Sequence, residues 1–324
     1  RDNLKLNVRV VGLSNSRTMA TNASGINLKD WKDALEKGVK ADSDVFYQTA
    51  KEFNLRNSIF VDNTANEHIA HTYARYLENN ISVVTCNKIA AADELSHYQK
   101  LKHLARKYNA PYLFETNVGA GLPIIDTLNN LIASGDNIHT IQAVLSGSLN
   151  FVFNEFNDQT TFRKVVERAM EAGYTEPDPK IDLSGVDVAR KILILARESG
   201  LSLELNDIEN RSFLPQSCLD TPDNEAFLTS LDAHSDHFES LYESAKNNNA
   251  RLKYVAELVD GKAKVGLKEI PEGHDFYNLE GSDNIVLFYT DRYKDQPLIV
   301  KGAGAGAEVT ASGIFADIIR IGKQ

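Results

Sequence analysis

Short apolar runs and longer stretches with apolar residues at helical spacing alternate along the first part of the chain. The runs have the length and composition of buried strands, whereas the intervening stretches have one apolar face, as helices do. We predict strands over 4–13, 58–62, 81–85 and 112–115, and helices over 31–37, 44–54, 66–79 and 93–108. Strands alternating with helices indicate an α/β fold with a doubly wound, Rossmann-like parallel sheet, which binds ligands beyond the carboxyl ends of its strands.

The pattern changes after Gly135, where several strands follow one another closely. Asp260-Gly261 has the composition of a tight hairpin turn between two of them. The predicted strands are 138–145, 252–259, 262–269, 284–290 and 298–302, and the predicted helices are 124–134, 186–199, 231–247 and 314–321, with a helical start at Phe151. This arrangement predicts a second, α+β domain with a mixed sheet. We place one domain at 1–122 with 303–324, and the other at 123–302.

Polar residues follow the predicted parallel strands: Ser14 and Arg17 after the first, Thr64 after the second and Lys88 after the third. A dinucleotide-binding fold often carries an acid at such a position, where it binds the ribose 2′-hydroxyl. No acid follows the first strand, and Arg17 suits a 2′-phosphate, which favours NADP over NAD; the alternative is a solvated loop. Lys88 begins a predicted helix, where positive charge is unfavourable, so a simple surface role is unattractive.

Ionisable side chains are concentrated between residues 173 and 191, which we take as the candidate site of the chemistry. Pro177 and Pro179 fix the backbone in this stretch and keep Glu176 and Asp178 out of helical geometry. The acids therefore converge from a rigid turn on the helix that follows.

The helix predicted over 186–199 is apolar on almost all sides, which indicates that it is buried. Ser184 is the expected N-cap, with Asp187 three residues later as its capping partner. Asp187 and Lys191 are four residues apart and share a face. Most acid–lysine pairs are minor surface contacts, but this lysine lies among aliphatic residues, where an unpartnered ammonium group is costly. A partly desolvated lysine beside carboxylates can donate and accept protons.

The same region also matches a known signature. The following run resembles that of the homoserine dehydrogenases: Ala169-x-x-x-Gly173-Tyr174-Thr175-x-x-Asp178-Pro179-x-x-Asp182-Leu183-x-Gly185-x-Asp187-x-x-x-Lys191. The resemblance covers essentially the whole chain and is closest to the C-terminal part of bifunctional aspartokinase–homoserine dehydrogenases. It implies an NAD(P)-dependent oxidoreductase acting on a CH–OH group. The reaction implied is the interconversion of L-homoserine and L-aspartate 4-semialdehyde, on the route to threonine, methionine and isoleucine.

The resemblance also implies roles for individual residues. It implies that Lys191 and Lys88 are catalytic, and that the substrate is bound by Glu176, Asp182 and Asp187. The implied cofactor-binding residues are Ser14, Arg17, Thr64, Lys88, Gly304 and Gly306. A monovalent cation such as Na⁺ is implied at Glu115, Val118, Ala120 and Leu122; Gly119 and Gly121 by themselves indicate only a tight turn. The implied partners are a second copy of the chain, which forms a homodimer through the mixed sheet, and a fused aspartokinase domain.

Composition narrows the other possibilities. A net charge of −10 argues against nucleic acid and anionic membranes as partners. Cys86 and Cys218 lie far apart, without metal-binding spacing, and are expected to be reduced thiols of a cytoplasmic protein. His234 and His237 have no third ligand in view, which favours a solvated face over a metal site.

One part of the family pattern is missing. The predicted strand over 4–13 corresponds to the second strand of the family's cofactor domain, so the first strand and its glycine-rich phosphate loop are absent. We therefore expect weak dinucleotide binding and a less stable region up to Glu115. The alternative function is a catalytically impaired binding or regulatory remnant of the enzyme.

Overall fold

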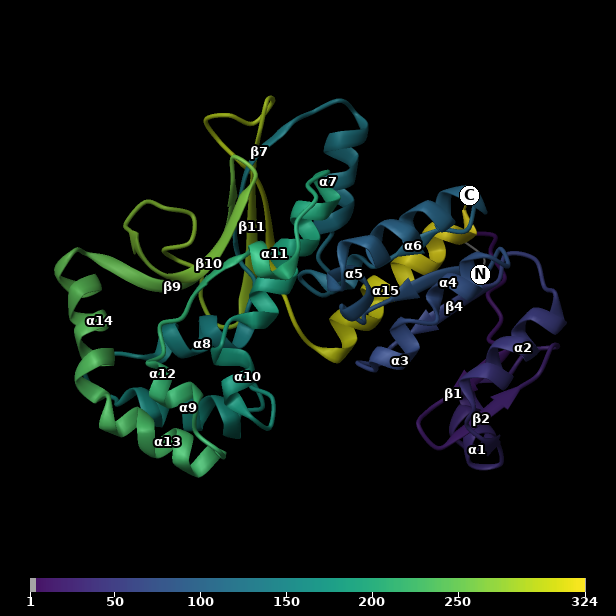
Figure 1. Ribbon diagram of the computed structural model, residues 1–324, viewed down its shortest axis with the longest axis horizontal. Helices are drawn as coiled ribbons and strands as arrows, with labels where there is room; N and C mark the ends of the chain where they lie inside the picture. Colours follow the sequence, from purple (N-terminus) through teal and green to yellow (C-terminus); the bar gives the residue numbers. More distant parts are fainter. Residues whose placement is uncertain (1–3, 324) are drawn as a thin grey trace. The chain divides into compact units, whose positions relative to one another are not determined.

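The computed structural model describes residues 4–323, which form two compact units (Figure 1). The first unit comprises the chain up to Asn87, Gln99–Leu113 and the stretch from Phe315 onward. The second unit comprises Lys88–Tyr98 and Phe114–Ile314. Among the described residues, none of the helices combines the length and apolar character that a membrane crossing requires.

A parallel sheet lies in the first unit, in the order β4 (Ile59–Asp62), β5 (Ser82–Thr85) and β6 (Tyr112–Leu113). Its core is aromatic: Phe60 of β4 stacks on Tyr76 with ring centroids 4.0 Å apart. The helices of this unit include α1 (Trp31–Glu36), α2 (Ser43–Phe53), α3 (Glu67–Ala70), α4 (Tyr73–Leu77) and the greater part of α6 (Leu95–Lys107), which begins in the second unit. The predicted parallel α/β arrangement is confirmed at this level.

The strand predicted over 4–13 was wrong for most of its length. Only β1 (Gly12–Ser14) forms, and it pairs antiparallel with β2 (Thr18–Thr21), which also pairs with β3 (Val39–Lys40). A tight turn follows β1, in which the Asn15 side chain accepts hydrogen bonds from the backbone N–H groups of Arg17 and Thr18. The turn folds the chain back on itself instead of feeding it into the parallel sheet.

Two helices predicted as continuous are broken. The one expected over 66–79 divides into α3 and α4 at Thr72, whose hydroxyl and backbone N–H both bond the carbonyl of Ile69. The one expected over 231–247 divides at His234 into α13 (Asn224–Ala233) and α14 (Ser235–Asn247). His234 is held there by Ser217 and by the Ser230 carbonyl.

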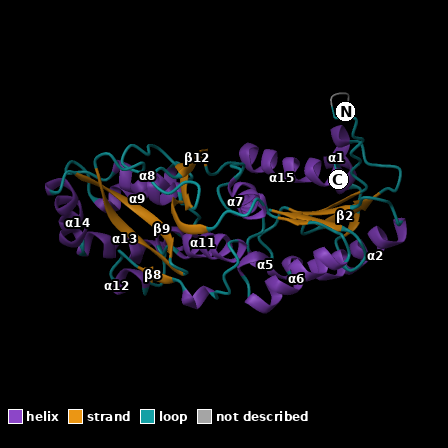
Figure 2. Cartoon of the chain, turned by 90° about the horizontal axis from the view of Figure 1, so that it is seen from above, coloured by secondary structure: helices purple, strands orange, loops and turns teal. Residues whose placement is uncertain are grey.

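The second unit is built on a six-stranded mixed sheet, which confirms the prediction (Figure 2). The order is β12 (Leu298–Ala303), β11 (Asp283–Thr290), β7 (Ile138–Val144), β9 (Ala250–Val259), β10 (Lys262–Pro271) and β8 (Glu209–Arg211). Its helices are α5 (Ile89–Ala92), α7 (Ile124–Ala133), α8 (Gly147–Glu155), α9 (Phe162–Glu171), α10 (Pro179–Leu183), α11 (Val186–Glu198), α12 (Gln216–Leu219), α13 and α14; α15 (Ala307–Gly322) begins in this unit. Asp260 and Gly261 both have positive φ, as the predicted hairpin turn requires.

One face of this sheet packs against the segment that connects β10 to β11. Val144, Val255 and Leu287 form a buried cluster with Phe276 and Leu279 of that segment. The segment is fastened by Lys253, whose buried ammonium donates hydrogen bonds to the Leu279 carbonyl and to the side chains of Asn150 and Asn154 on α8. Burial lowers the pKa of Lys253 to about 8.

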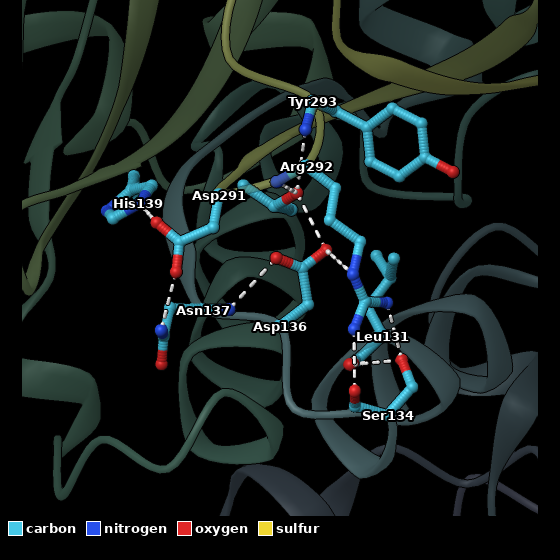
Figure 3. Close-up of polar contacts among 9 residues, drawn as sticks. Leu131, Ser134, Asp136, Asn137, His139, Asp291, Arg292 and Tyr293 are labelled. Carbon is cyan, nitrogen blue, oxygen red and sulfur yellow. Dashed lines mark hydrogen bonds and ion pairs between the residues drawn. The ribbon is translucent and has the colours of Figure 1, made fainter.

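The tip of the β11–β12 hairpin is tied to the connection between α7 and β7 (Figure 3). The buried Asp136 carboxylate accepts a hydrogen bond from the Thr290 hydroxyl at 2.9 Å and forms an ion pair with Arg292. Arg292 in turn donates to the hydroxyl and the carbonyl oxygen of Ser134. Asp291 accepts a hydrogen bond from Asn137 on the same connection. These contacts fix the tip of the hairpin to the segment that leads into β7.

Candidate active site

The centre of the candidate site is a carboxylate between two lysines. Asp187, in the first turn of α11, lies with one oxygen 2.7 Å from Lys191 Nζ and the other 3.5 Å from Lys88 Nζ. Lys191 Nζ also donates a hydrogen bond of 2.7 Å to the carbonyl of Leu145, at the end of β7. The structure therefore brings together three of the predicted site residues and holds one ammonium group in a defined position.

Burial and the neighbouring charges together shift the pKa values of Lys191 and Asp187. Burial lowers the pKa of Lys191, and the positive charge of Lys88 lowers it further, although Asp187 opposes both effects. Burial by itself raises the pKa of Asp187, but the two ammonium groups outweigh it and hold that pKa well below the usual range. The carboxylate is thus ionised while the lysine is brought closer to the pH range in which it exchanges protons.

Asp182 forms the second carboxylate of the site. Its oxygens accept hydrogen bonds from the Ser148 hydroxyl at 3.1 Å and from the backbone N–H of Glu176 at 2.8 Å. Burial raises the pKa of Asp182, and the negative charge of Asp187 adds to the effect. The Glu176 side chain itself is exposed and has no hydrogen bond or ion pair among the described residues.

Two serines of this site were missed from the sequence. Ser146 caps α8 by accepting a hydrogen bond from the backbone N–H of Leu149, and its hydroxyl lies 3.0 Å from that of Ser148. The helix was predicted to begin only at Phe151. The available signal was Ser146, which directly follows the predicted strand over 138–145. Serine is a preferred N-cap, so it could have marked the start of the helix.

The predicted cap of α11 was wrong. Ser184 ends α10, and Gly185 occupies the N-cap position with a φ of 74° and no side-chain hydrogen bond. Asp187 is therefore free of a capping role and pairs with the lysines instead. A Cβ atom on Gly185 would lie 1.9 Å from the hydroxyl oxygen of Tyr254, so only glycine fits between α10 and α11.

The remaining candidates of the second unit lie on two loops. Glu115 is buried, and its two carboxylate oxygens accept the backbone N–H groups of Ile125 and Asp126 at the start of α7. Val118, Ala120 and Leu122 follow on the same loop, where Gly119 and Ala120 have positive φ. Gly304 and Gly306 follow β12, on the connection to α15.

The other candidates belong to the first unit. Ser14 and Arg17 are exposed at the turn between β1 and β2, and Thr64 is exposed after β4. The loop after β4 is positioned by Asp62, which is 2% exposed and accepts hydrogen bonds from the Thr64 N–H, the Tyr73 hydroxyl and the Asn87 side chain. The carboxyl ends of β4 and β5 are thereby fixed to each other, as a ligand-binding sheet edge requires.

Two family profiles match the chain. The profile of the homoserine dehydrogenase NAD-binding domain matches residues 1–115, which assigns this part of the chain to the dehydrogenase class of NAD-binding domains. The profile of homoserine dehydrogenase matches residues 123–319. The chain belongs to the homoserine dehydrogenase family.

Relatives and solved structures agree with this assignment. The chain is 43% identical to bifunctional aspartokinase/homoserine dehydrogenase 1, chloroplastic, from Zea mays, over 99% of the chain and 35% of that protein. It thus spans about a third of the length of such bifunctional relatives. It is 38% identical to the homoserine dehydrogenase of Schizosaccharomyces pombe, over 92% of the chain and 82% of that protein.

Two solved structures show the same fold. A protein of unknown function from Candida auris superimposes with a TM-score of 0.92 at 35% identity, over 99% of this chain and 93% of that one. A hyperthermophilic archaeal homoserine dehydrogenase in complex with NADPH superimposes with a TM-score of 0.73 at 26% identity, over 96% and 87%.

The glycine at the α10–α11 junction gives a direct test of the site's local geometry. Gly185→Ala is expected to destabilise the protein by about 1–3 kcal/mol more than Gly173→Ala, because only the first introduces a clash. Gly173 is the matched control: its φ is also positive, at 72°, but a Cβ there meets nothing within 4 Å. Urea unfolding of both variants measures the difference. Equal losses would show that Tyr254 does not restrict the junction.

Proposed function

We propose that the chain catalyses the NAD(P)-dependent interconversion of L-homoserine and L-aspartate 4-semialdehyde. The observation that carries this proposal is the buried Lys191 ammonium, held between Asp187 and the Leu145 carbonyl, with Lys88 on the other side of the carboxylate. Family membership supplies the reaction, since the profile that matches this unit is that of homoserine dehydrogenase.

Lys191 is the proposed acid and base. It takes the proton from the substrate hydroxyl during oxidation and returns it to the carbonyl oxygen during reduction. Its lowered pKa favours this exchange because both protonation states become accessible nearer to neutral pH. Lys88 adds positive charge, which stabilises the oxygen as negative charge develops on it. The bound nicotinamide supplies or accepts the hydride.

The acids of the site are proposed to hold the substrate. Asp187 and Glu176 are suited to bind its ammonium group by charge-assisted hydrogen bonds. Asp182 shapes the pocket and keeps the Glu176 backbone in place through its hydrogen bond to that N–H. Ser148 extends the same polar wall.

The proposed cofactor is NADP, with NAD as the alternative. Arg17, exposed after β1, is suited to a 2′-phosphate, and no acid occupies the same turn. The structural neighbour that is in complex with NADPH supports this preference. The other proposed cofactor-binding residues are Ser14, Thr64, Lys88, Gly304 and Gly306.

A monovalent cation such as Na⁺ is proposed at the loop that starts with Glu115. The carboxylate and loop carbonyls are oxygen donors, which hard cations prefer. The two oxygens of Glu115 accept the backbone N–H groups of Ile125 and Asp126 at the start of α7. The donor set therefore fits a cation, with Val118, Ala120 and Leu122 as the carbonyl ligands.

The remaining features of the proposal concern the assembly. We assign 1–122 and 303–324 to a Rossmann-like cofactor domain and 123–302 to substrate binding and homodimer formation. An aspartokinase domain fused to this part of the chain is proposed from the bifunctional relatives. The proposed compartment is the cytoplasm, although the relatives from Zea mays and Arabidopsis thaliana are chloroplastic by name.

The proposed acid–base role predicts the effect of removing one ammonium group. Lys191→Met should lower kcat for homoserine oxidation by roughly 10²–10⁴-fold, the range for losing a positioned acid or base. Lys180→Met is the control, because the side chain of Lys180 is 15% exposed, close to the 12% of Lys191, but donates to the Thr221 carbonyl. Lys180→Met should stay within a few-fold of the wild type. Near-normal turnover of Lys191→Met would remove it from the mechanism; a wild-type protein that binds NADPH without turnover would favour the regulatory remnant.

The proposed cofactor preference is tested at the turn after β1. Arg17→Ala should weaken NADPH binding about tenfold and leave NADH binding nearly unchanged, because only NADPH loses a charge-assisted contact. Titration of cofactor fluorescence measures both constants. Equal losses for the two cofactors would contradict a role at the 2′-phosphate.

A further inference from the structure

The side chain of Asn284 on β11 is fully buried without a polar partner. It is 0% exposed, and neither its oxygen nor its nitrogen has a hydrogen-bond partner among the described residues. A buried amide without partners costs stability, and natural proteins satisfy nearly all such groups. A group left unpaired in this way calls for a functional explanation.

Asn284 lies beside the carbonyl that holds the acid–base lysine. Ile285 pairs with Val144, the last residue of β7, so Asn284 lies one position further along, at the level of Leu145. The Leu145 carbonyl accepts the hydrogen bond from Lys191 Nζ. The unpaired amide is therefore one strand away from the centre of the candidate site.

The amide also faces the same side of the sheet as α11. Ile285 packs into the cluster with Val255, so the preceding residue of each strand points to the opposite side. On β9 that preceding residue is Tyr254, which touches Gly185 at the start of α11. Asn284 holds the equivalent position on β11.

The cover over this amide is a glycine. A Cβ atom on Gly304 would lie 2.0 Å from the side-chain carbonyl carbon of Asn284, so only glycine fits at position 304. Gly302 and Gly306, on either side, have φ of 156° and 115°, conformations that glycine adopts at little cost. Gly304 thus covers the amide with backbone atoms alone.

We infer that Asn284 binds the carboxamide of the nicotinamide ring once the segment 302–306 has lifted away from it. A primary amide presents donor and acceptor together, and its natural complement is another primary amide. The nicotinamide ring carries one, and the hydride must be transferred next to Lys191. This inference rests on the proposed function and adds to it a residue that recognises the reactive end of the cofactor.

Asn284→Leu separates this role from a structural one, because it keeps the branched shape and removes both polar atoms. We expect NADPH to bind roughly tenfold more weakly, whereas 2′-phospho-ADP-ribose, which lacks the ring, should bind as to the wild type. The melting temperature of the ligand-free variant should stay equal or rise, since an unpaired buried amide is lost. An NADPH analogue with an acetyl group in place of the carboxamide should lose affinity for the wild type but not for the variant.

Asn150→Leu is the matched control. Asn150 is also 0% exposed, but its amide is fully used, accepting from Lys253 and donating to the Gly281 and Asp283 carbonyls. This variant should lose stability. Equal weakening of NADPH and 2′-phospho-ADP-ribose by Asn284→Leu, unchanged NADPH binding, or a melting temperature lowered as in Asn150→Leu would each overturn the inference. A wild-type protein that binds no NADPH would refute the proposed function along with it.

Discussion

The placement of a lysine ammonium group in a mostly apolar environment is the constraint on which the site depends. Lys191 lies on a helix whose other buried residues, apart from Arg197, are aliphatic, and its side chain is only 12% exposed. Such a charge is tolerated because Asp187 lies one turn earlier and the Leu145 carbonyl accepts a second hydrogen bond. The site is therefore built from groups that contact this lysine or its carboxylate partner: the end of β7, the start of α11 and Lys88.

Local backbone features serve the same arrangement. Gly185 lets α11 begin against Tyr254, which directs the first turn of the helix and Asp187 toward the lysines. The Asn210 side chain ties the same junction by accepting from the Tyr254 hydroxyl and donating to the Ser184 carbonyl. Asn284 differs from Asn210, because its buried amide has no hydrogen-bond partner among the described residues and therefore lowers the stability of the fold. Function explains such a cost better than packing does.

The sequence pattern predicted those features of the fold and the site that depend on residues close together in the chain. The buried helix α11, the Asp187–Lys191 pairing and the Asp260–Gly261 turn follow from spacing and composition, and the structure confirms them. The predicted strand over 4–13 was wrong because only its end forms a strand, β1, which pairs antiparallel with β2 across the turn at Asn15, and an apolar run does not encode that partner. The Ser148–Asp182 contact joins residues 34 positions apart, so no periodicity encodes it. The Ser184 cap failed because a glycine with positive φ occupied the cap position.

The pKa of Lys191 tests the central claim most directly. In protein with isotope-labelled lysine side chains, NMR titration should place that pKa below the ordinary value of 10.5, because burial disfavours the charged form. Asp187→Asn should lower it further by removing the opposing negative charge, and Lys88→Met should raise it by removing a like charge. A Lys191 that titrates at the ordinary value in the wild type and does not respond to Asp187→Asn would contradict the account.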